Sequence, residues 1–261
     1  MISSDFRTEA RRKLSGKWGK AACITLAYLL VFFLLGMIEG SFPDSMENLF
    51  SIISTVIEVP LSFGLIFSFM KLYNGEEVKA FDFFSLGFSN FAKSWKISLH
   101  IVLKMIVPVI LIIVSCVLIG VGTYGTVGAS LYSSSATAGF GGLAIVGFIL
   151  FIVSMIWAVT KSYYYQLSYF VAIDNEDMTA KEVVEKSAEL MEGKRAKLFW
   201  LELSFIGWAI LGFLTLCIGY IWLAPYVQMA TINFYKFVSG NTSNVEAEVV
   251  TENNDNPVQG E

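Results

Sequence analysis

Residues 97–121 read ISLHIVLKMIVPVILIIVSCVLIGV and are apolar at almost every position. A helix needs roughly 20 consecutive apolar residues to cross the hydrocarbon core of a bilayer. The run is too continuous for a strand of a membrane barrel, in which apolar and polar residues alternate over about ten residues. It therefore predicts a membrane-spanning helix and an all-α fold.

Similar runs lie on both sides of this segment. The six predicted spans cover residues 21–38, 49–72, 97–121, 142–164, 198–217 and 220–238. Charged residues make up 15% of the chain, 55% of the residues are hydrophobic and the mean hydropathy is +0.63. Soluble domains carry about 25% charged residues, and six helices buried in a soluble core would leave too little polar surface. We therefore expect a polytopic membrane protein with six transmembrane helices.

Positive charge is confined to alternate connections between these spans. Residues 39–48, 122–141 and 218–219 contain no Lys or Arg, whereas six cations precede the first span and others lie in the connections 73–96 and 165–197. Cytoplasmic segments of membrane proteins are enriched in Lys and Arg. The pattern predicts a multi-pass protein of the cell (plasma) membrane with both termini cytoplasmic. The first run is long enough to stay as an anchor rather than a cleaved signal peptide.

A short helix is predicted before each odd-numbered span. Before the third span, the aromatic residues of 81–95 share one helical face. Before the fifth, Thr179 and Glu182 have the spacing of a capping box. These features suggest three helical hairpins, each preceded by a cytoplasmic amphipathic helix that meets anionic lipid headgroups. Positive-inside loops and aromatic belts can also imitate such a repeat, and the sequence does not choose between the two.

Two polar, weakly hydrophobic segments are predicted to lie outside the membrane. Residues 122–141 are rich in Gly, Ser, Thr and Ala, and we expect a flexible outer loop. Residues 239–261 carry acidic side chains and no cation, so we expect a disordered acidic cytoplasmic tail.

Ionisable residues inside a bilayer are functional candidates. Glu58 lies near the middle of the second span and Pro60 follows two residues later. A proline breaks or kinks the helix and frees a carbonyl, so the pair could bind a proton or a cation. The alternative is a protonated or hydrogen-bonded Glu58 that only holds helices together.

Three further polar residues lie at similar depth. His100 and Lys104 share a face of the third span, and Glu202 lies within the fifth. We expect Glu202 to pair with Lys104 or His100, which would satisfy all three groups; the alternative is a proton relay.

Enzymatic chemistry finds little support. The chain has one His, no serine nucleophile elbow, no metal-binding His pair and no phosphate-binding glycine loop. We expect that the protein is not an enzyme and uses no cofactor. It is predicted to organise membrane lipid or to support a partner complex. The expected partners are the lipid bilayer, a membrane protein or a second copy of the chain, and not nucleic acid. A small transporter or channel using Glu58 and Pro60 is the alternative.

Several motifs in the chain are similar to one known family. They are Leu14–Ser15–Gly16–Lys17–Trp18, Ser187, Leu190–Met191, Gly193, Leu203–Ser204–Phe205–Ile206–Gly207–Trp208, Leu214–Thr215, Gly219, Trp222 and Pro225–Tyr226. Together they resemble the bacterial membrane-protein family called domain of unknown function nine-seventy-five, common in Gram-positive bacteria. Asp174–Asn175–Glu176 departs from an Asp-Asn-Pro pattern. The resemblance implies an integral membrane protein and supplies no catalytic residues.

Overall fold

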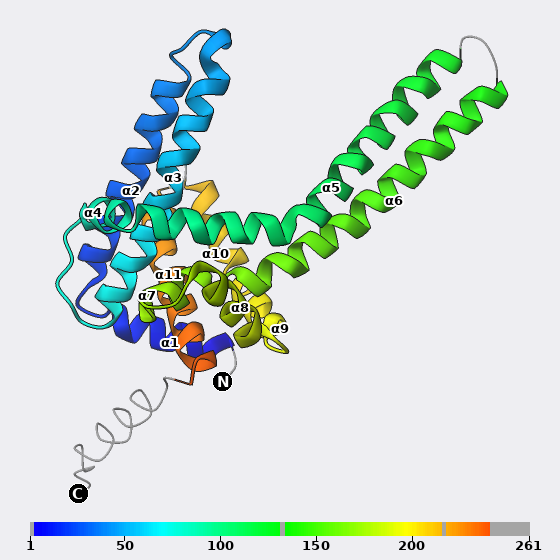
Figure 1. Ribbon diagram of the computed structural model, residues 1–261. Helices are drawn as coiled ribbons and strands as arrows, with labels where there is room; N and C mark the ends of the chain where they lie inside the picture. Colours follow the sequence, from blue (N-terminus) through cyan, green and yellow to red (C-terminus); the bar gives the residue numbers. More distant parts are fainter. Residues whose placement is uncertain (1–2, 131–133, 216–217, 241–261) are drawn as a thin grey trace, which may run out of the picture.

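The computed structural model describes residues 3–130, 134–215 and 218–240, and within these ranges the chain forms helices and turns without a strand. Figure 1 shows two long helical pairs rising from a compact assembly of short helices. The helices are α1 (Ser3–Leu14), α2 (Trp18–Glu39), α3 (Asp44–Tyr73), α4 (Asp82–Ser89), α5 (Phe91–Ala129), α6 (Ser134–Tyr165), α7 (Ser168–Asp174), α8 (Ala180–Met191), α9 (Arg195–Leu203), α10 (Ile206–Leu214) and α11 (Tyr220–Val238).

Five segments of the described chain are long and apolar enough to cross a membrane. They are Trp18–Glu39, Asn48–Tyr73, Phe91–Gly128, Thr137–Asp174 and Arg195–Leu214. The all-helical membrane class is therefore confirmed. The predicted sixth span, residues 220–238, forms α11 but does not reach this apolarity, because Gln228, Asn233 and Lys236 interrupt it. Ten of its 19 residues are buried by the protein itself.

The hydrophobic core lies where the ends of three helices meet. We call this region the base: α1, α4, α7, α8, residues 61–73 of α3 and residues 225–238 of α11. Phe170 of α7 stacks on Tyr235 of α11 at 5.6 Å between ring centroids, and Phe63 of α3 meets Tyr169 edge-on at 5.3 Å. These rings join α3, α7 and α11 into one core that contains the largest fully buried side chains.

Each short helix packs on the end of one of these three. Helix α1 packs on α11, α4 on α3 and α8 on α7. Phe6 of α1 lies between the rings of Phe234 and Phe237, at 5.6 and 5.5 Å. Gly64 of α3 and Gly87 of α4 bring two backbones into direct contact, since a Cβ on Gly64 would lie 1.9 Å from the carbonyl oxygen of Phe83. The short helices therefore enclose the core on its sides.

Three lysines tie the start of one helix to the end of another. Lys17 donates to the carbonyl of Leu72 at 3.2 Å, Lys93 to that of Ala172 at 2.8 Å, and Lys194 to that of Val238 at 3.4 Å. Each acceptor lies in the last turn of its helix, where carbonyl groups lack an intrahelical donor and the helix dipole favours a cation. The same contact thus recurs three times along the chain.

The outer halves of α5 and α6 form what we call the arm, residues 109–129 and 134–155. Figure 1 shows this pair leaving the base and diverging from the α2–α3 pair. Helix α5 changes direction between the base and the arm (Figure 1), and Pro108 lies inside this helix. Proline is the usual cause of a kink in a helix. The two helices pack closely because Gly122 meets the backbone of Ala144, where a Cβ would come within 2.5 Å.

The predicted flexible outer loop over 122–141 is therefore wrong for most of its length. Helix α5 continues to Ala129 and α6 begins at Ser134. Small residues at a helix–helix contact let backbones approach, and this use of glycine looks like a loop signal when the partner helix is not known.

Two predicted helices are interrupted, and one predicted cap is confirmed. The aromatic segment 81–95 breaks at Asn90 between α4 and α5, and the predicted span 198–217 breaks at Ser204–Phe205 between α9 and α10. Thr179 and Glu182 form the capping box, with the Glu182 carboxylate accepting from the Thr179 N–H at 2.8 Å. The predicted tail beyond Gly240 lies outside the described residues.

Candidate functional site

Pro60 removes one backbone hydrogen bond inside α3, as predicted, but the carbonyl that loses its partner accepts a hydrogen bond from another side chain. Pro60 lacks an N–H, so the carbonyl of Val56, one turn earlier, loses its intrahelical partner. The indole N–H of Trp95 donates to this oxygen at 3.2 Å. The backbone of Gly87 packs directly against the next turn of α3, since a Cβ on Gly87 would lie 2.2 Å from the Pro60 carbonyl oxygen. Half-buried Glu58 therefore lies beside a filled position rather than an open carbonyl site.

The expected pairing of Glu202 with Lys104 or His100 is wrong. The Glu202 carboxylate accepts from the Tyr163 hydroxyl and from the Gln166 amide, both at 2.5 Å. His100 bonds through Nδ1 to the carbonyl of Lys96, in its own helix, and Lys104 is exposed. The reason is the packing of α9, which contacts the end of α6 and so brings Glu202 to that helix. The five candidate residues do not form one site.

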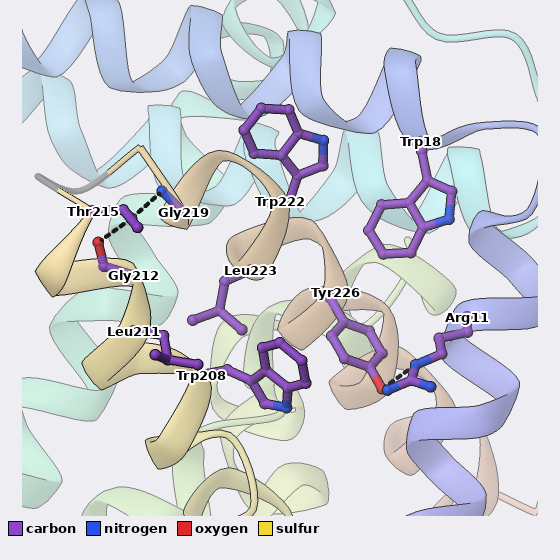
Figure 2. Close-up of a pocket in the computed structure, with 10 residues that line it drawn as sticks. All are labelled: Arg11, Trp18, Trp208, Leu211, Gly212, Thr215, Gly219, Trp222, Leu223 and Tyr226. Carbon is purple, nitrogen blue, oxygen red and sulfur yellow. Dashed lines mark hydrogen bonds between the residues drawn. The ribbon is translucent and has the colours of Figure 1, made fainter.

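A ligand-sized groove lined largely by aromatic residues lies among α1, α2, α10 and α11. It has a volume of about 380 Å³, and small-ligand pockets usually measure about 300–1,000 Å³. Helices α1, α2, α10 and α11 line what we call the tryptophan groove, with Arg11, Trp18, Trp208, Leu211, Gly212, Thr215, Gly219, Trp222, Leu223 and Tyr226. Figure 2 shows Arg11 on one side of the groove and Thr215 and Gly219 on the other.

Local sequence explains how α10 and α11 approach at this groove. A Cβ on Gly219 would lie 2.8 Å from the Cα of Gly212, so this approach requires glycine at position 219, and a Cβ on Gly212 would lie 3.3 Å from the Tyr220 ring. Thr215 donates through Oγ1 to the Gly212 carbonyl at 2.9 Å and accepts from the Gly219 N–H at 3.1 Å. Tyr220 adds a hydrogen bond to the carbonyl of Ala209 at 3.1 Å. The groove wall is therefore held by backbone contacts as well as by ring packing.

Arg11 supplies the positive charge of the groove. Its Nε donates to the Tyr226 hydroxyl at 3.0 Å, and its guanidinium carbon lies 5.4 Å from the centre of that ring. Arg7, one helical turn earlier, donates to the carbonyl of Ser204 at 3.5 Å. No ion pair among the described residues involves either arginine. Two cations without a carboxylate partner therefore lie on the same side of α1.

A second apolar groove, of about 440 Å³, lies between α6 and α9. Its cation, Arg195, lies over the ring of Tyr164 at 4.2 Å, so this guanidinium is already engaged by a protein partner. Among the described residues, no group of three or more His, Cys, Asp or Glu side chains could hold a metal ion.

Residues 1–242 match the family described as "Protein of unknown function (DUF975)". The chain belongs to this family. The match covers every helix described above and confirms the resemblance found in the sequence motifs. No curated protein and no solved structure matches this DUF975 chain.

Sequence reasoning about this DUF975 chain missed the tryptophan groove as a site. Trp18 and Trp222 lie near ends of predicted spans, which is also where interfacial aromatic belts occur, and Trp208 lies within the apolar span 198–217. The usable sequence signal was Trp18, which follows the arginine-rich segment 7–12 at the entry to the first span. Their convergence depends on α1 packing under α11, which no local pattern predicts.

Proposed function

We propose that this chain is a non-enzymatic protein of the plasma membrane that crosses the bilayer six times and organises the lipid around it. The observation that carries the proposal is the small share of its apolar helices that the protein covers. In the most apolar windows of the segments Phe91–Gly128 and Thr137–Asp174, only 11% of residues are buried. Lipid must cover the remaining surface, so lipid is the main partner of these helices.

The contact between α1 and α11 supports an even number of crossings. Asn233, near the end of α11, donates to the carbonyl of Phe6 at 3.3 Å. The helix before the first crossing and the end of the last helix therefore lie close together, which supports a return of α11 across the membrane. Its 19 residues extend about 28 Å at helical rise, close to the hydrocarbon thickness of about 30 Å. Excess Lys and Arg on that side favours the cytoplasm.

The three lysine contacts support an arrangement as three hairpins. Each joins the start of an outgoing helix to the end of the helix that returns, so each hairpin is closed at the same place. The short helix before each hairpin packs on the hairpin before it, and α1 packs on the last, so the three units close a ring.

The exposed aromatic row of α4 adds a lipid-facing surface beside the base. The ring centroids of Phe84 and Phe88 are 4.6 Å apart, and those of Phe88 and Phe91 are 6.2 Å apart. All three side chains are exposed. Aromatic side chains favour the interfacial layer of a membrane. The row therefore suits a helix lying at the bilayer surface.

Transport through Glu58 is the alternative function, and the geometry favours it less. The carbonyl freed by Pro60 accepts from Trp95, and the helices around Glu58 leave much of their surface outside the protein. A partner complex remains compatible with the lipid role, since the same apolar helices can meet another membrane protein.

Topology is tested with reporter fusions placed after Gly40, Ser130 and Gly240. Fusions after Gly40 and Ser130 should report the outer compartment, and the fusion after Gly240 should report the cytoplasm. If Ser130 and Gly240 report the same compartment, the six crossings are wrong.

The lipid role is tested with purified full-length chain in vesicles of phosphatidylcholine and phosphatidylglycerol. We expect a protein-dependent change in the fluorescence of a lipid-order probe, and no proton or cation flux under an imposed gradient. A flux that the Glu58→Gln variant abolishes, without a change in thermal stability, would replace the lipid role by transport.

A further inference from the structure

We propose that the tryptophan groove is a specific site for one anionic phospholipid, with an acyl chain along the tryptophans and the headgroup phosphate on Arg11. The inference deepens the lipid role proposed above by naming a ligand class and the residues that select it. It rests on the shape, chemistry and charge of the groove.

The walls suit a hydrocarbon chain. Trp208, Leu211 and Trp222 are each about half exposed, at 51%, 54% and 51%, so the groove opens towards the surrounding bilayer instead of closing inside the protein. A lipid chain can therefore enter sideways from the membrane. An acyl chain that enters the groove loses apolar contacts with neighbouring lipid chains and replaces them with contacts to the indole rings. Indole rings are among the largest apolar surfaces that side chains offer.

The charge at one end selects the headgroup. Arg11 uses Nε for the Tyr226 hydroxyl, and its two terminal nitrogens form no hydrogen bond with the described residues. A guanidinium presents these nitrogens as a planar fork that matches the oxygens of a phosphate. Tyr226 is 7% exposed and fixes the direction of this fork. Arg7 adds positive potential one turn away without a carboxylate to neutralise it.

Neighbouring residues show why this groove is the specific one. In the second groove, Arg195 lies against the Tyr164 ring, so its charge is already paired with an aromatic face. Arg12, adjacent to Arg11 in the sequence, forms an ion pair with Glu9 at 2.9 Å. Arg11 lines an apolar groove without the ion pair that Arg12 forms, and its guanidinium carbon lies farther from the Tyr226 ring centre, at 5.4 Å, than that of Arg195 lies from the Tyr164 ring centre, at 4.2 Å.

The test is native mass spectrometry of the full-length chain in mild detergent, with dioleoyl phosphatidylglycerol and dioleoyl phosphatidylcholine as competing probes. Wild-type protein should retain one phosphatidylglycerol with about tenfold preference over phosphatidylcholine, because both headgroups offer a phosphate to Arg11 but the choline ammonium would be repelled by Arg11 and Arg7. Arg11→Gln should lose the preference and Arg11→Lys should keep part of it. Arg12→Gln is the matched control and should retain the wild-type preference.

A second variant separates the chain from the headgroup. Trp222→Ala should reduce retention of both lipids while leaving their ratio unchanged, because it shortens the groove without touching the charge. Size-exclusion profiles and thermal melting of every variant must match the wild type. Inorganic phosphate at millimolar concentration should neither displace the lipid nor raise the melting temperature.

Three outcomes would overturn the site. They are an unchanged preference in Arg11→Gln, an equal loss in Arg12→Gln, which would indicate general attraction to positive charge, and displacement by inorganic phosphate, which would indicate a simple anion site. The site and the proposed function fail separately. A lipid-order effect that persists in Arg11→Gln while retention is unchanged removes the site alone, and specific retention without any lipid-order effect removes the function alone.

Discussion

The base and the arm use the same apolar residue types but place them in different solvents. In the base, other protein side chains cover Phe6, Phe83 and Phe234, whose exposed fractions are 2% or less. In the arm, Ile145, Phe148 and Ile149 remain more than half exposed, and the two helices contact mainly each other. Hydrophobic burial drives folding where water would otherwise reach the side chain, whereas lipid tails offer an arm residue almost the same environment as protein.

This difference means that the base should determine stability and the arm should tolerate substitution. The comparison also locates specificity, because the tryptophan groove lies where exposed α10 and the first turn of α11 adjoin the base. The substitutions below compare paired positions in the two regions or within the base, from the largest expected effect to the smallest.

The largest contrast is expected for phenylalanine truncation. Phe6→Ala should lower the free energy of unfolding by about 3–5 kcal/mol, because it leaves a cavity between two rings of α11. Phe148→Ala in the arm should change it by less than about 1 kcal/mol, since lipid fills the space. Unfolding measured in bicelles checks both, and equal losses would show that the arm is also protein-packed.

The next effect is steric and depends on helix contact. Gly64→Ala should destabilise by about 1–3 kcal/mol, because the new Cβ would overlap the carbonyl of Phe83 and force α3 and α4 apart. Gly120→Ala meets nothing within 4 Å and should stabilise α5 by up to about 1 kcal/mol. Thermal melting of both variants measures the difference, and a stable Gly64→Ala variant would contradict the close crossing.

The Trp95–Val56 contact can be isolated with a double-mutant cycle. Trp95→Phe should cost about 2 kcal/mol because the Val56 carbonyl loses its donor. In a Pro60→Ala background, the new backbone N–H at position 60 can satisfy that carbonyl, so the same change should cost less than about 0.5 kcal/mol. Equal costs in both backgrounds would mean that Trp95 acts through packing alone.

The lysine contacts of the base should each contribute modestly. Lys17→Met removes the donor to the Leu72 carbonyl and should cost about 1 kcal/mol. Lys20→Met is the nearby control, since its pair with Glu77 is 3.8 Å long and largely exposed, and it should change stability by less than about 0.5 kcal/mol. A smaller loss for Lys17→Met than for the control would argue against a role in closing the hairpin.

The smallest effect is a pH dependence at the start of α8. Hydrogen bonds from the Thr179 backbone and side chain hold the pKa of Glu182 below its ordinary value. This contribution to stability is complete above the pKa of the unfolded chain and is lost as pH falls through the lower pKa of the folded chain. The melting temperatures of wild type and Glu182→Gln should therefore differ at neutral pH and converge in acid. A constant gap would show that the charge is not involved.

Much of the local structure followed from sequence patterns alone. Continuous apolar runs predicted helices and a membrane location, and the Thr179–Glu182 spacing predicted a cap that forms. These features depend on residues within one or two turns of each other. The motifs at Trp208 and Trp222 likewise identified the family without reference to any contact.

Errors arose where partners lie far apart in the chain. Glu202 bonds to Tyr163 and Gln166 because α9 packs on α6, and Trp95 fills the carbonyl gap made by Pro60 because α5 crosses α3. Gly122 and Gly125, which the sequence pattern placed in a loop, lie in α5 where α6 packs directly against them. A pattern within one segment does not contain the identity of its neighbour.

Local sequence patterns suffice to show that this chain is helical, apolar and positively charged on alternate connections, because each of these properties is a sum over neighbouring residues. Only the tertiary structure brought Arg11 beside Tyr226 and placed three tryptophans around one groove. It also decided that α11, the least apolar of the predicted spans, is buried by protein, since burial depends on how α1 and α3 pack around it. The sequence specifies the chemistry of each side chain, whereas packing between segments far apart in the chain decides which other side chains it contacts.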